Sequence, residues 1–569
     1  MDMRRVLEVA RGEKPADLLL KNGKVVFLPT GEIIEKDIAI CEGVIAGLGD
    51  YEAYEVIDLN GAYVTPGFIE SHVHIESSLV TPLEFLKAVA LYGTTTVVAD
   101  PHEIANVMGL EGIKFMLEDS KNAIIDLFLE VPSCVPATSL ETAGAELDEG
   151  AVQAALKYPR IVGLGEVMDF PGVVLGDDDL LTKIEKTKAM GMEVAGHAPM
   201  IGDKWLNAYL ASGVQSDHEV ATVEEGLEKL RYGMYVLLRY GSAAKDIFNL
   251  YSLVNEKTSE FLLLCADDRH PEDLLNEGHL NMHLSFLVKK GIDPVIALRL
   301  ATINPARYFG FKDRGIIAPG KLADLNVFED LEKFTPKMVF KRGRLIVKDG
   351  EIADGLKRNL YDSFPNTVHV DVSSLNLDIP ARSNKVKAIK LLPHQIITEC
   401  EIVEPRVEGG LLQADPQRDI LKVAVIERHG KNGGMAAGFL TGYGLKKGAI
   451  AQTISHDSHN IVAVGVADEA ILKVVERLRE IKGGIVLWDE EEFYELPLPI
   501  GGLMSTLPLE EVKDRLKIIL KRAENLGVKP EIDAVLSLGF IALPVIPNLR
   551  LSDRGLIDSS KIEFTSLWV

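Results

Sequence analysis

Short apolar runs alternate with helix-length segments through residues 66–309. The runs carry β-branched residues and leucine at consecutive positions, which is typical of strands that are buried on both faces. Polar residues gather where each run ends. The eight runs are AYVTPGFIESHVH, TTTVVADPHE, IIDLFLEVP, IVGLGEVM, EVAGHAP, VQSDHEV, MYVLLRYGS and FLLLCADDRHP. They predict an α/β fold, a (β/α)8 TIM-like barrel whose functional residues lie at the C-terminal ends of its strands.

Shorter strands with tight turns flank this region on both sides. Residues 1–65 contain several strand-length runs and the dipeptide Asn22-Gly23, which is a strong hairpin signal. Residues 310–355 return to the same pattern of strand, turn and strand. We therefore expect the two segments to form one β-sandwich, built from both ends of an inserted barrel domain.

The remaining third of the chain predicts a separate domain. Residues 356–385 are polar and rich in turn-forming residues, which indicates a connector. Residues 386–569 combine strand-like runs and glycine-rich turns with two amphipathic helices, expected around 469–482 and 509–526. This mixture predicts a C-terminal α+β domain.

Charge limits the expected partners. The chain has 61 Lys and Arg against 85 Asp and Glu, which gives a formal net charge of −24. Such a surface repels phosphate backbones and anionic lipids, so we expect neither nucleic acid nor a membrane as partner. The first residues lack the apolar stretch of a secretory signal, and no run of about 18 apolar residues predicts a membrane span. We expect a cytoplasmic protein.

The sharpest chemical signal is the pair His72 and His74 at the end of the first predicted barrel strand. Side chains two positions apart in a strand point to the same face, so both imidazoles can bind one metal. The pair alone is weak evidence, because two polar residues in a loop give the same pattern. It is strengthened by further candidate ligands at the ends of four other predicted strands: Glu166, His197, His218 and Asp267.

These six side chains suit two divalent metal ions. We expect one ion to bind His72, His74 and Asp267 and the other to bind His197 and His218, with the Glu166 carboxylate shared between them. Two adjacent cations would lower the pKa of a shared water, and Asp267 could pass its proton to a leaving amine. Asp267 and Glu166 are therefore the predicted catalytic residues.

The ligand types narrow the choice of metal. The four cysteines are far apart in sequence, so any metal would be held by nitrogen and oxygen. Such ligands leave zinc, manganese and iron possible, and the carboxylates favour Mn(II) or Fe(II).

This constellation resembles the amidohydrolase superfamily, in which these strand ends hold metal in a (β/α)8 barrel. Many members place a carbamylated lysine on strand four, whereas GLGEVM offers Glu166. The segments TPGFIESHVHIESS, VVADPHEIANV, GEVMDFPGV, CADDRHPEDL and TISHDSHNI resemble the bacterial and archaeal adenine deaminase family over nearly the whole chain. The resemblance implies hydrolysis of adenine to hypoxanthine and ammonia by attack of hydroxide on purine C6, with a binuclear Mn(II) or Fe(II) centre.

Other residues at strand ends are candidates for substrate binding. Asp100, His102 and Glu103 follow the second strand, and could hydrogen-bond the purine, hold a further metal or cap the next helix. Arg239 ends the seventh strand and either orients the substrate or pairs with an acid at the rim. Asp268, Arg269 and His270 follow the aspartate of the eighth strand, and one of them, with Asp268 as the candidate for substrate binding, could hold Asp267 or a substrate nitrogen.

The C-terminal domain contributes one further motif, His456-Asp457-Ser458-His459, which follows a glycine-rich stretch. We expect this loop to close over the barrel mouth, in its own subunit or in a partner of a homo-oligomer, with His459 near the substrate. A polar turn without a functional role is the alternative. By contrast, His279 and His283 lie on a predicted helix without an acidic partner at the right spacing, so we expect surface or packing roles.

Two alternative functions remain. Another amidohydrolase activity, such as opening a cyclic amide or removing an N-acyl group, would use the same metals on a different electrophile. A non-catalytic relative would have lost ligands, whereas all six are present. The sequence lacks the H-x-E and P-C-x-x-C signature of zinc deaminases, HExxH, a P-loop and a GxGxxG after a strand. The resemblance to the adenine deaminase family implies a small-molecule partner, adenine.

Overall fold

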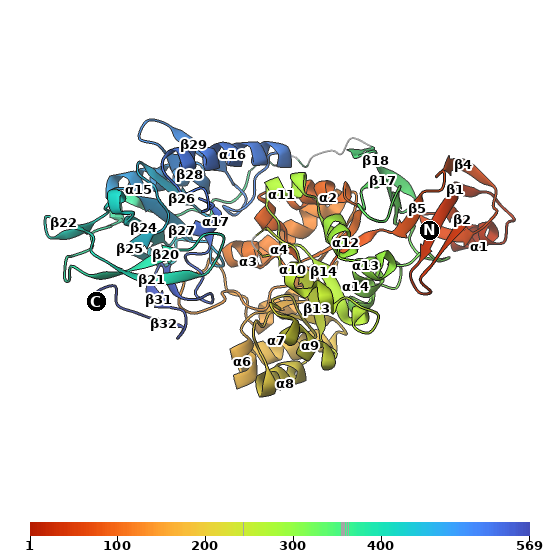
Figure 1. The fold of residues 1–569 in the computed structure, drawn as a ribbon, viewed down its shortest axis with the longest axis horizontal. Coiled ribbons are helices and arrows are strands. Elements are labelled where there is room, and N and C mark those ends of the chain that lie inside the picture. The colour runs from red at the N-terminus through yellow and green to blue at the C-terminus, as the bar shows by residue number, and fades with distance from the viewer. Residues whose placement is uncertain (243, 354–358, 360, 362) are drawn as a thin grey trace.

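The computed structural model describes residues 1–242, 244–353, 359, 361 and 363–569, so the predicted connector lies partly outside the described residues. Figure 1 shows an N-terminal sheet at one end of the molecule, helix-covered strands in the middle and a C-terminal domain at the other end. Among the described residues, no helix has the length and apolar character that a membrane crossing requires.

Parallel strands from the middle of the chain form a TIM-like barrel. They are β6 (Phe68–Glu70), β7 (Val73–His74), β8 (Thr94–Ala99), β9 (Asp126–Val131), β10 (Ile161–Val167), β11 (Glu193–Gly196), β12 (Ser216–Asp217), β13 (Tyr235–Arg239), β14 (Leu262–Cys265) and β15 (Asp267–Asp268). One sheet has the order β11-β10-β9-β8-β6 and another the order β12-β13-β14. A bond from Gln215 N to Val194 O joins β12 to β11, and β15 pairs with β7 at the opposite seam.

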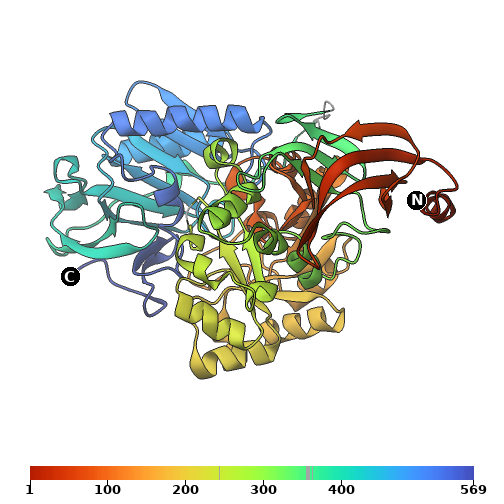
Figure 2. The ribbon, with the colours of Figure 1, turned by 45° about the vertical axis from the view of Figure 1, so that its right-hand side comes forward.

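Helices cover the outside of these strands, as the turned view in Figure 2 shows. They include α2 (Pro82–Ala90), α3 (His102–Met108), α4 (Leu110–Asp119), α5 (Glu149–Ala155), α7 (Asp178–Ala189), α8 (Asp203–Ser212), α9 (Val223–Arg231), α12 (Leu280–Lys289) and α13 (Pro294–Leu300). All six residues of β8 are buried, because helices cover one face and the barrel interior the other. Burial on both faces explains why these strands read as continuous apolar runs.

Both ends of the barrel segment contribute to one nine-stranded sheet. Its strands are β1 (Ala16–Phe27), β2 (Glu32–Cys41), β3 (Val44–Leu48), β4 (Ala53–Asp58), β5 (Tyr63–Pro66), β16 (Leu325–Phe328), β17 (Pro336–Lys341), β18 (Arg344–Lys348) and β19 (Glu351–Ile352). The antiparallel pair β5–β16, with Val64 opposite Val327, joins the N-terminal strands to those that follow the barrel.

The expected hairpin turn at Asn22-Gly23 is wrong. Both residues lie inside the long strand β1, where the pairing with β2 shifts register between Leu20 and Gly23. Asn22 has φ 57°, and a Cβ on Gly23 would meet Leu59 and Val64 side-chain atoms at 2.9 Å. The dipeptide therefore supplies a bulge and a close packing contact rather than a turn.

The C-terminal part of the chain forms an eight-stranded sheet among its described residues, in the order β21-β20-β25-β24-β27-β26-β28-β29. The strands are β20 (Val386–Leu391), β21 (Thr398–Val403), β24 (Leu421–Ile426), β25 (Met435–Thr441), β26 (Ala449–Gln452), β27 (Ile461–Gly465), β28 (Gly484–Trp488) and β29 (Phe493–Pro497). Helices α15 (Asp468–Glu480) and α16 (Leu509–Asn525) occupy the positions of the two predicted amphipathic helices, and a short helix, α17 (Leu536–Gly539), follows.

Candidate metal centre

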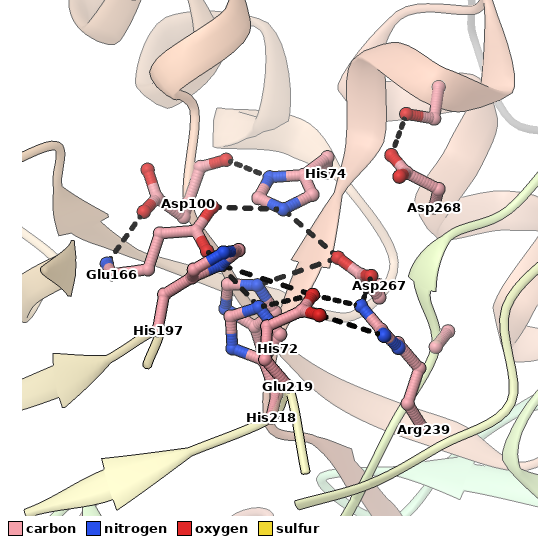
Figure 3. Close-up of polar contacts among 12 residues, drawn as sticks. His72, His74, Asp100, Glu166, His197, His218, Glu219, Arg239, Asp267 and Asp268 are labelled. Carbon is pink, nitrogen blue, oxygen red and sulfur yellow. Dashed lines mark hydrogen bonds and ion pairs between the residues drawn. The ribbon is translucent and has the colours of Figure 1, made fainter. Parts of the chain in front are cut away.

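The six predicted metal ligands converge at one end of the barrel, and Figure 3 shows their side chains pointing toward one another. All of them lie at or just after the ends of barrel strands, and all except the half-buried His197 are buried. The candidate ligand groups here overlap: one consists of His72, His74 and Asp267, and a second contains His197 and His218 together with a further acid.

The first group consists of His72, His74 and Asp267. Nε2 of His74 lies 3.1 Å from Oδ1 of Asp267, and Nε2 of His72 lies 3.7 Å from the same oxygen. Pairing of β7 with β15 sets this distance, because Asp267 stands opposite Val73, between the two histidines. The histidines are on the same face of their strand, as the sequence predicts.

Glu166 lies between this group and the second. Its Oε2 is 2.7 Å from Nδ1 of His197 and 3.1 Å from Nε2 of His218. Its Oε1 is 3.4 Å from Nε2 of His74. Each carboxylate oxygen therefore faces a different group of histidines, which is the arrangement that a carboxylate shared by two cations needs.

Sequence reasoning missed one acidic residue of the second group, Glu219. Its Oε1 lies 3.9 Å from Nδ1 of His197 and 3.7 Å from Nε2 of His218, and the three residues form a candidate ligand group. The signal was available, because Glu219 directly follows His218 in the segment SDHEV.

Arg239 forms ion pairs with an acidic residue of each group. It donates to Oδ2 of Asp267 at 2.8 Å and to Oε2 of Glu219 at 3.1 Å, and it also pairs with Asp246. Burial alone would raise the pKa of the Asp267 carboxyl, but the Arg239 guanidinium outweighs burial and holds that pKa well below its usual range. Asp267 is therefore ionised at neutral pH.

The donor set fits divalent cations. Nε2 of His72 is buried and has no hydrogen-bond partner among the described residues, although a buried imidazole nitrogen ordinarily has one. Several carboxylate oxygens and imidazole nitrogens face one another here at 2.7–3.7 Å, without sulfur. Nitrogen and oxygen ligands of this kind suit manganese, iron and zinc.

Asp100 forms polar contacts with two members of this cluster. Its carboxylate Oδ2 accepts the backbone N–H of Glu166 at 3.0 Å, and its backbone carbonyl lies 2.9 Å from Nδ1 of His74. The contact with the carbonyl requires a proton on Nδ1, which leaves Nε2 of His74 free to face Asp267. Asp100 therefore orients two candidate ligands.

His102 and Glu103 link the cluster to the C-terminal domain. Nδ1 of His102 lies 3.2 Å from Oε1 of Glu166, and its Nε2 lies 3.4 Å from Oε1 of Glu103. The two oxygens of Glu103 contact Nδ1 of His456 and Nε2 of His459. The loop between β26 and β27 therefore reaches the barrel mouth of its own chain, on the side of helix α3.

Asp268 faces away from the two groups. Its Oδ1 accepts a hydrogen bond from the hydroxyl of Ser77, which lies in the 3-10 turn Ile75–Ser78 after β7, whereas Asp268 itself belongs to strand β15. Burial, reinforced by the neighbouring Asp267, raises the pKa of the Asp268 carboxyl. Figure 3 shows it on the outer side of Asp267.

A second residue missed by sequence reasoning, Glu70, holds two barrel strands together beneath the cluster. Its carboxylate accepts the backbone N–H of His72 at 3.0 Å and that of Ala266 at 3.2 Å. Nε2 of His279 lies 3.0 Å from its Oε2, and Nδ1 of the same histidine lies 2.8 Å from the Thr94 hydroxyl. His279 and His283 are both buried, so the expected packing role holds for them rather than the surface role, and the acidic partner of His279 is distant in sequence but close in space.

Glu70→Gln should lower metal affinity by about 10–100-fold, the usual effect of losing a residue that orients a ligand. The amide cannot accept both backbone N–H groups and face His279 as the carboxylate does, so the spacing of His72 and Asp267 relaxes. Metal affinity is measured by competition with a chelator. Glu130→Gln is the matched control, since burial raises the pKa of the Glu130 carboxyl well above its usual range and an amide replaces a neutral acid. Equal affinities of both variants and the wild type would remove this role of Glu70.

Comparison with known proteins identifies two matching families. Residues 63–346 match the amidohydrolase family, and residues 395–563 match the adenine deaminase C-terminal domain. Adenine deaminase 2 of Carboxydothermus hydrogenoformans is 47% identical over 564 residues, covering 98% of this chain and 97% of that protein. The adenine deaminase of Desulfatibacillum aliphaticivorans is 44% identical over 569 residues, covering 99% of each. Among solved structures, the L-hydantoinase of Arthrobacter aurescens aligns with a TM-score of 0.45 at 18% identity, over 60% of this chain and 98% of that one.

Proposed function

Because this chain belongs to the adenine deaminase family, we propose that it hydrolyses adenine to hypoxanthine and ammonia. The observation that carries the proposal is the position of Glu166, whose two oxygens face two groups of histidines. We propose that His72, His74 and Asp267 hold one divalent cation, that His197 and His218 hold the other, and that Glu166 is shared. Manganese or iron fits this carboxylate-rich set best, and zinc is also compatible.

Two divalent cations bound in this way would lower the pKa of a shared water and polarise the carbon under attack. The residues of the chain supply the rest. Asp267, which Arg239 keeps ionised, takes a proton from the attacking water and returns it to the departing amino group. A bond forms between the oxygen of the attacking water and C6 of adenine. The bond from C6 to the exocyclic nitrogen breaks, and ammonia leaves.

Six further residues are proposed to bind or position the substrate: Asp100, His102, Glu103, Arg239, Asp268 and His459. Of these, Asp100 supports the proposed ligands, whereas Glu103 and His459 contact each other across the domain boundary. The homo-oligomeric assembly and the cytoplasmic location stay predictions.

The domain limits predicted from the sequence belong to the same proposal. We divide the chain into a β-sandwich from residues 1–65 and 310–355, a barrel from 66–309, a connector from 356–385 and an α+β domain from 386–569. The pairing of β5 with β16 supports assigning residues 1–65 and 310–355 to one domain.

Ammonia release from a panel of substrates tests the proposed function. The purified protein is loaded with Mn(II) or Fe(II) and offered adenine, adenosine, cytosine and a dihydropyrimidine in separate reactions. We expect ammonia from adenine. Ring opening of the dihydropyrimidine without ammonia from adenine would contradict the proposal and support a cyclic amidase instead.

His459→Ala should lower the turnover of adenine by roughly tenfold while leaving metal content unchanged. The substitution removes one of two histidine contacts to Glu103, and Glu103 neighbours His102, which contacts Glu166. Steady-state kinetics and metal analysis of the same preparation measure both quantities. His394→Ala, an exposed histidine of the same domain, is the control. Unchanged turnover in His459→Ala would show that the loop has no role in the reaction.

A further inference from the structure

We propose that Lys229 and Tyr209, two buried side chains from helices outside the barrel, position the ligands of the second cation, so that this cation can be weakened without loss of the first. The inference rests on the proposed function, because it concerns the ligand group that contains His197 and His218. Both residues act on the backbone beside these ligands, and both are therefore positioning residues.

Lys229 is at the centre of a buried ion-pair network on helix α9. Its side chain and that of Asp217 are both 0% exposed. Its Nζ lies 2.5 Å from Oδ2 of Asp217 and 2.6 Å from Oε1 of Glu225, and it donates to the backbone carbonyl of Ala198 at 3.0 Å. Burial lowers the pKa of the ammonium group, but the two carboxylates outweigh burial and raise that pKa. Lys229 is therefore charged inside the protein.

The network holds the two chain segments that carry the second ligand group. Ala198 directly follows His197, and its backbone N–H donates to Oδ1 of Asp217 at 3.3 Å, while its carbonyl accepts from Lys229. The same oxygen of Asp217 accepts the backbone N–H of Glu219 at 2.8 Å. One buried ion pair thus ties together the ends of strands β11 and β12, which sets how far apart the two histidines after these strands lie.

Tyr209 makes a second connection at the same place. It is completely buried on helix α8, and its hydroxyl accepts the backbone N–H of His197 at 3.2 Å. The hydroxyl donates in turn to the backbone carbonyl of Val167 at 2.7 Å, one residue after Glu166. A single hydroxyl therefore links the strand that carries the shared carboxylate to the strand that precedes one of its histidine partners.

The two ligand groups thus depend on different buried residues. The first group is held by the Glu70 carboxylate, which accepts the backbone N–H groups of His72 and Ala266. The second depends on Lys229 and Tyr209, which belong to helices that cover the barrel. Loss of a residue that orients metal ligands lowers metal affinity by about 10–100-fold. Loss of Lys229 should therefore weaken one cation selectively.

Lys229→Met tests this assignment through metal binding. We expect competition with a chelator to show that one equivalent of Mn(II) binds about 10–100-fold more weakly than in the wild type, while the other keeps its affinity. Excess Mn(II) should restore most of the turnover of adenine, a rescue that a general loss of structure would not allow.

Lys341→Met is the matched control for this variant. Lys341 is a buried lysine that also contacts two carboxylates, those of Asp126 and Asp324, and a backbone carbonyl, that of Thr95. These contacts lie where strands β8 and β9 begin, at the opposite end of the barrel from the ligands. Lys341→Met should bind both equivalents of Mn(II) as the wild type does. Equal weakening in the two lysine variants would overturn the assignment.

Combination with ligand variants identifies the affected cation. Added to His197→Ala, which removes a ligand of the second group, Lys229→Met should change the affinity for the remaining equivalent little. Added to His72→Ala, which removes a ligand of the first group, it should weaken the remaining equivalent by the same about 10–100-fold. The reverse pattern, or an equal effect in both backgrounds, would contradict the assignment of Lys229 to the second cation.

Tyr209→Phe guards against misfolding of the lysine variant, because it removes one hydroxyl and retains the ring. We expect it to weaken the same equivalent of Mn(II) by several-fold. Unchanged affinities in Tyr209→Phe and Lys229→Met, or equal weakening of both equivalents, overturn the inference while the proposed function stands. Wild-type protein that binds two equivalents but releases no ammonia from adenine overturns the proposed reaction and leaves this assignment in place. A wild type that binds fewer than two equivalents overturns both.

Discussion

Glu166→Ala should reduce the turnover of adenine by about 10³-fold or more, because removing the shared carboxylate affects both proposed cation positions at once. In the structure, Oε1 of Glu166 faces His74 and Oε2 faces His197 and His218. With alanine at position 166, each group of histidines lacks the carboxylate oxygen that faces it in the wild type. We therefore also expect fewer than two equivalents of bound metal in this variant, measured by elemental analysis of the purified protein.

Glu185→Ala, a change of the same type at an exposed position of helix α7, controls for the loss of one acidic residue. It should bind metal and turn over adenine as the wild type does. A Glu166→Ala protein with two equivalents of metal and undiminished turnover would show that this carboxylate is not shared between cations.

Asp267→Asn should lower kcat by about 10²–10⁴-fold, the usual contribution of a general acid or base. The amide retains the size of the side chain but cannot take a proton from the attacking water at neutral pH. It also loses the charge that Arg239 pairs with at 2.8 Å. We expect KM for adenine to change less than kcat, because the proposed role of Asp267 is proton transfer during the reaction rather than binding of the base. Steady-state kinetics with saturating metal separate the two parameters.

Asp246→Asn is the comparison for this variant. Asp246 pairs with the same guanidinium, with 2.7 Å between Nη2 of Arg239 and Oδ2, but it belongs to neither candidate ligand group. Its replacement should therefore have a small effect on kcat. An equal loss in both variants would indicate that Arg239 needs all its partners for structural reasons, and would remove the proton-transfer role from Asp267.

The barrel and the convergence of its strand ends could be predicted from sequence for a physical reason. Strands buried on both faces require consecutive apolar residues, and parallel strands bring their carboxyl ends to one rim. His72, His74 and Asp267 therefore had to lie near one another once the strands were identified in order. Glu166, between the two histidine groups, follows from the same argument.

Contacts between residues that are distant in sequence could not be predicted in this way. His279 has no nearby acid along the chain, and its partner Glu70 becomes apparent only when strand β6 and the start of helix α12 come together. The contacts of the Glu103 carboxylate with His456 and His459 depend on how the barrel packs against the C-terminal domain. Local patterns also misled at Asn22-Gly23, where packing against Leu59 and Val64 favours a bulge.

We propose that two divalent cations, held by these six side chains, are both required for the hydrolysis of adenine. The most direct test is to remove metal with a chelator, add Mn(II) in measured steps and follow the initial rate of ammonia release. We predict that the rate rises until two equivalents per chain are bound and then becomes constant. A rate that is maximal at one equivalent, or that does not depend on added metal, would contradict it.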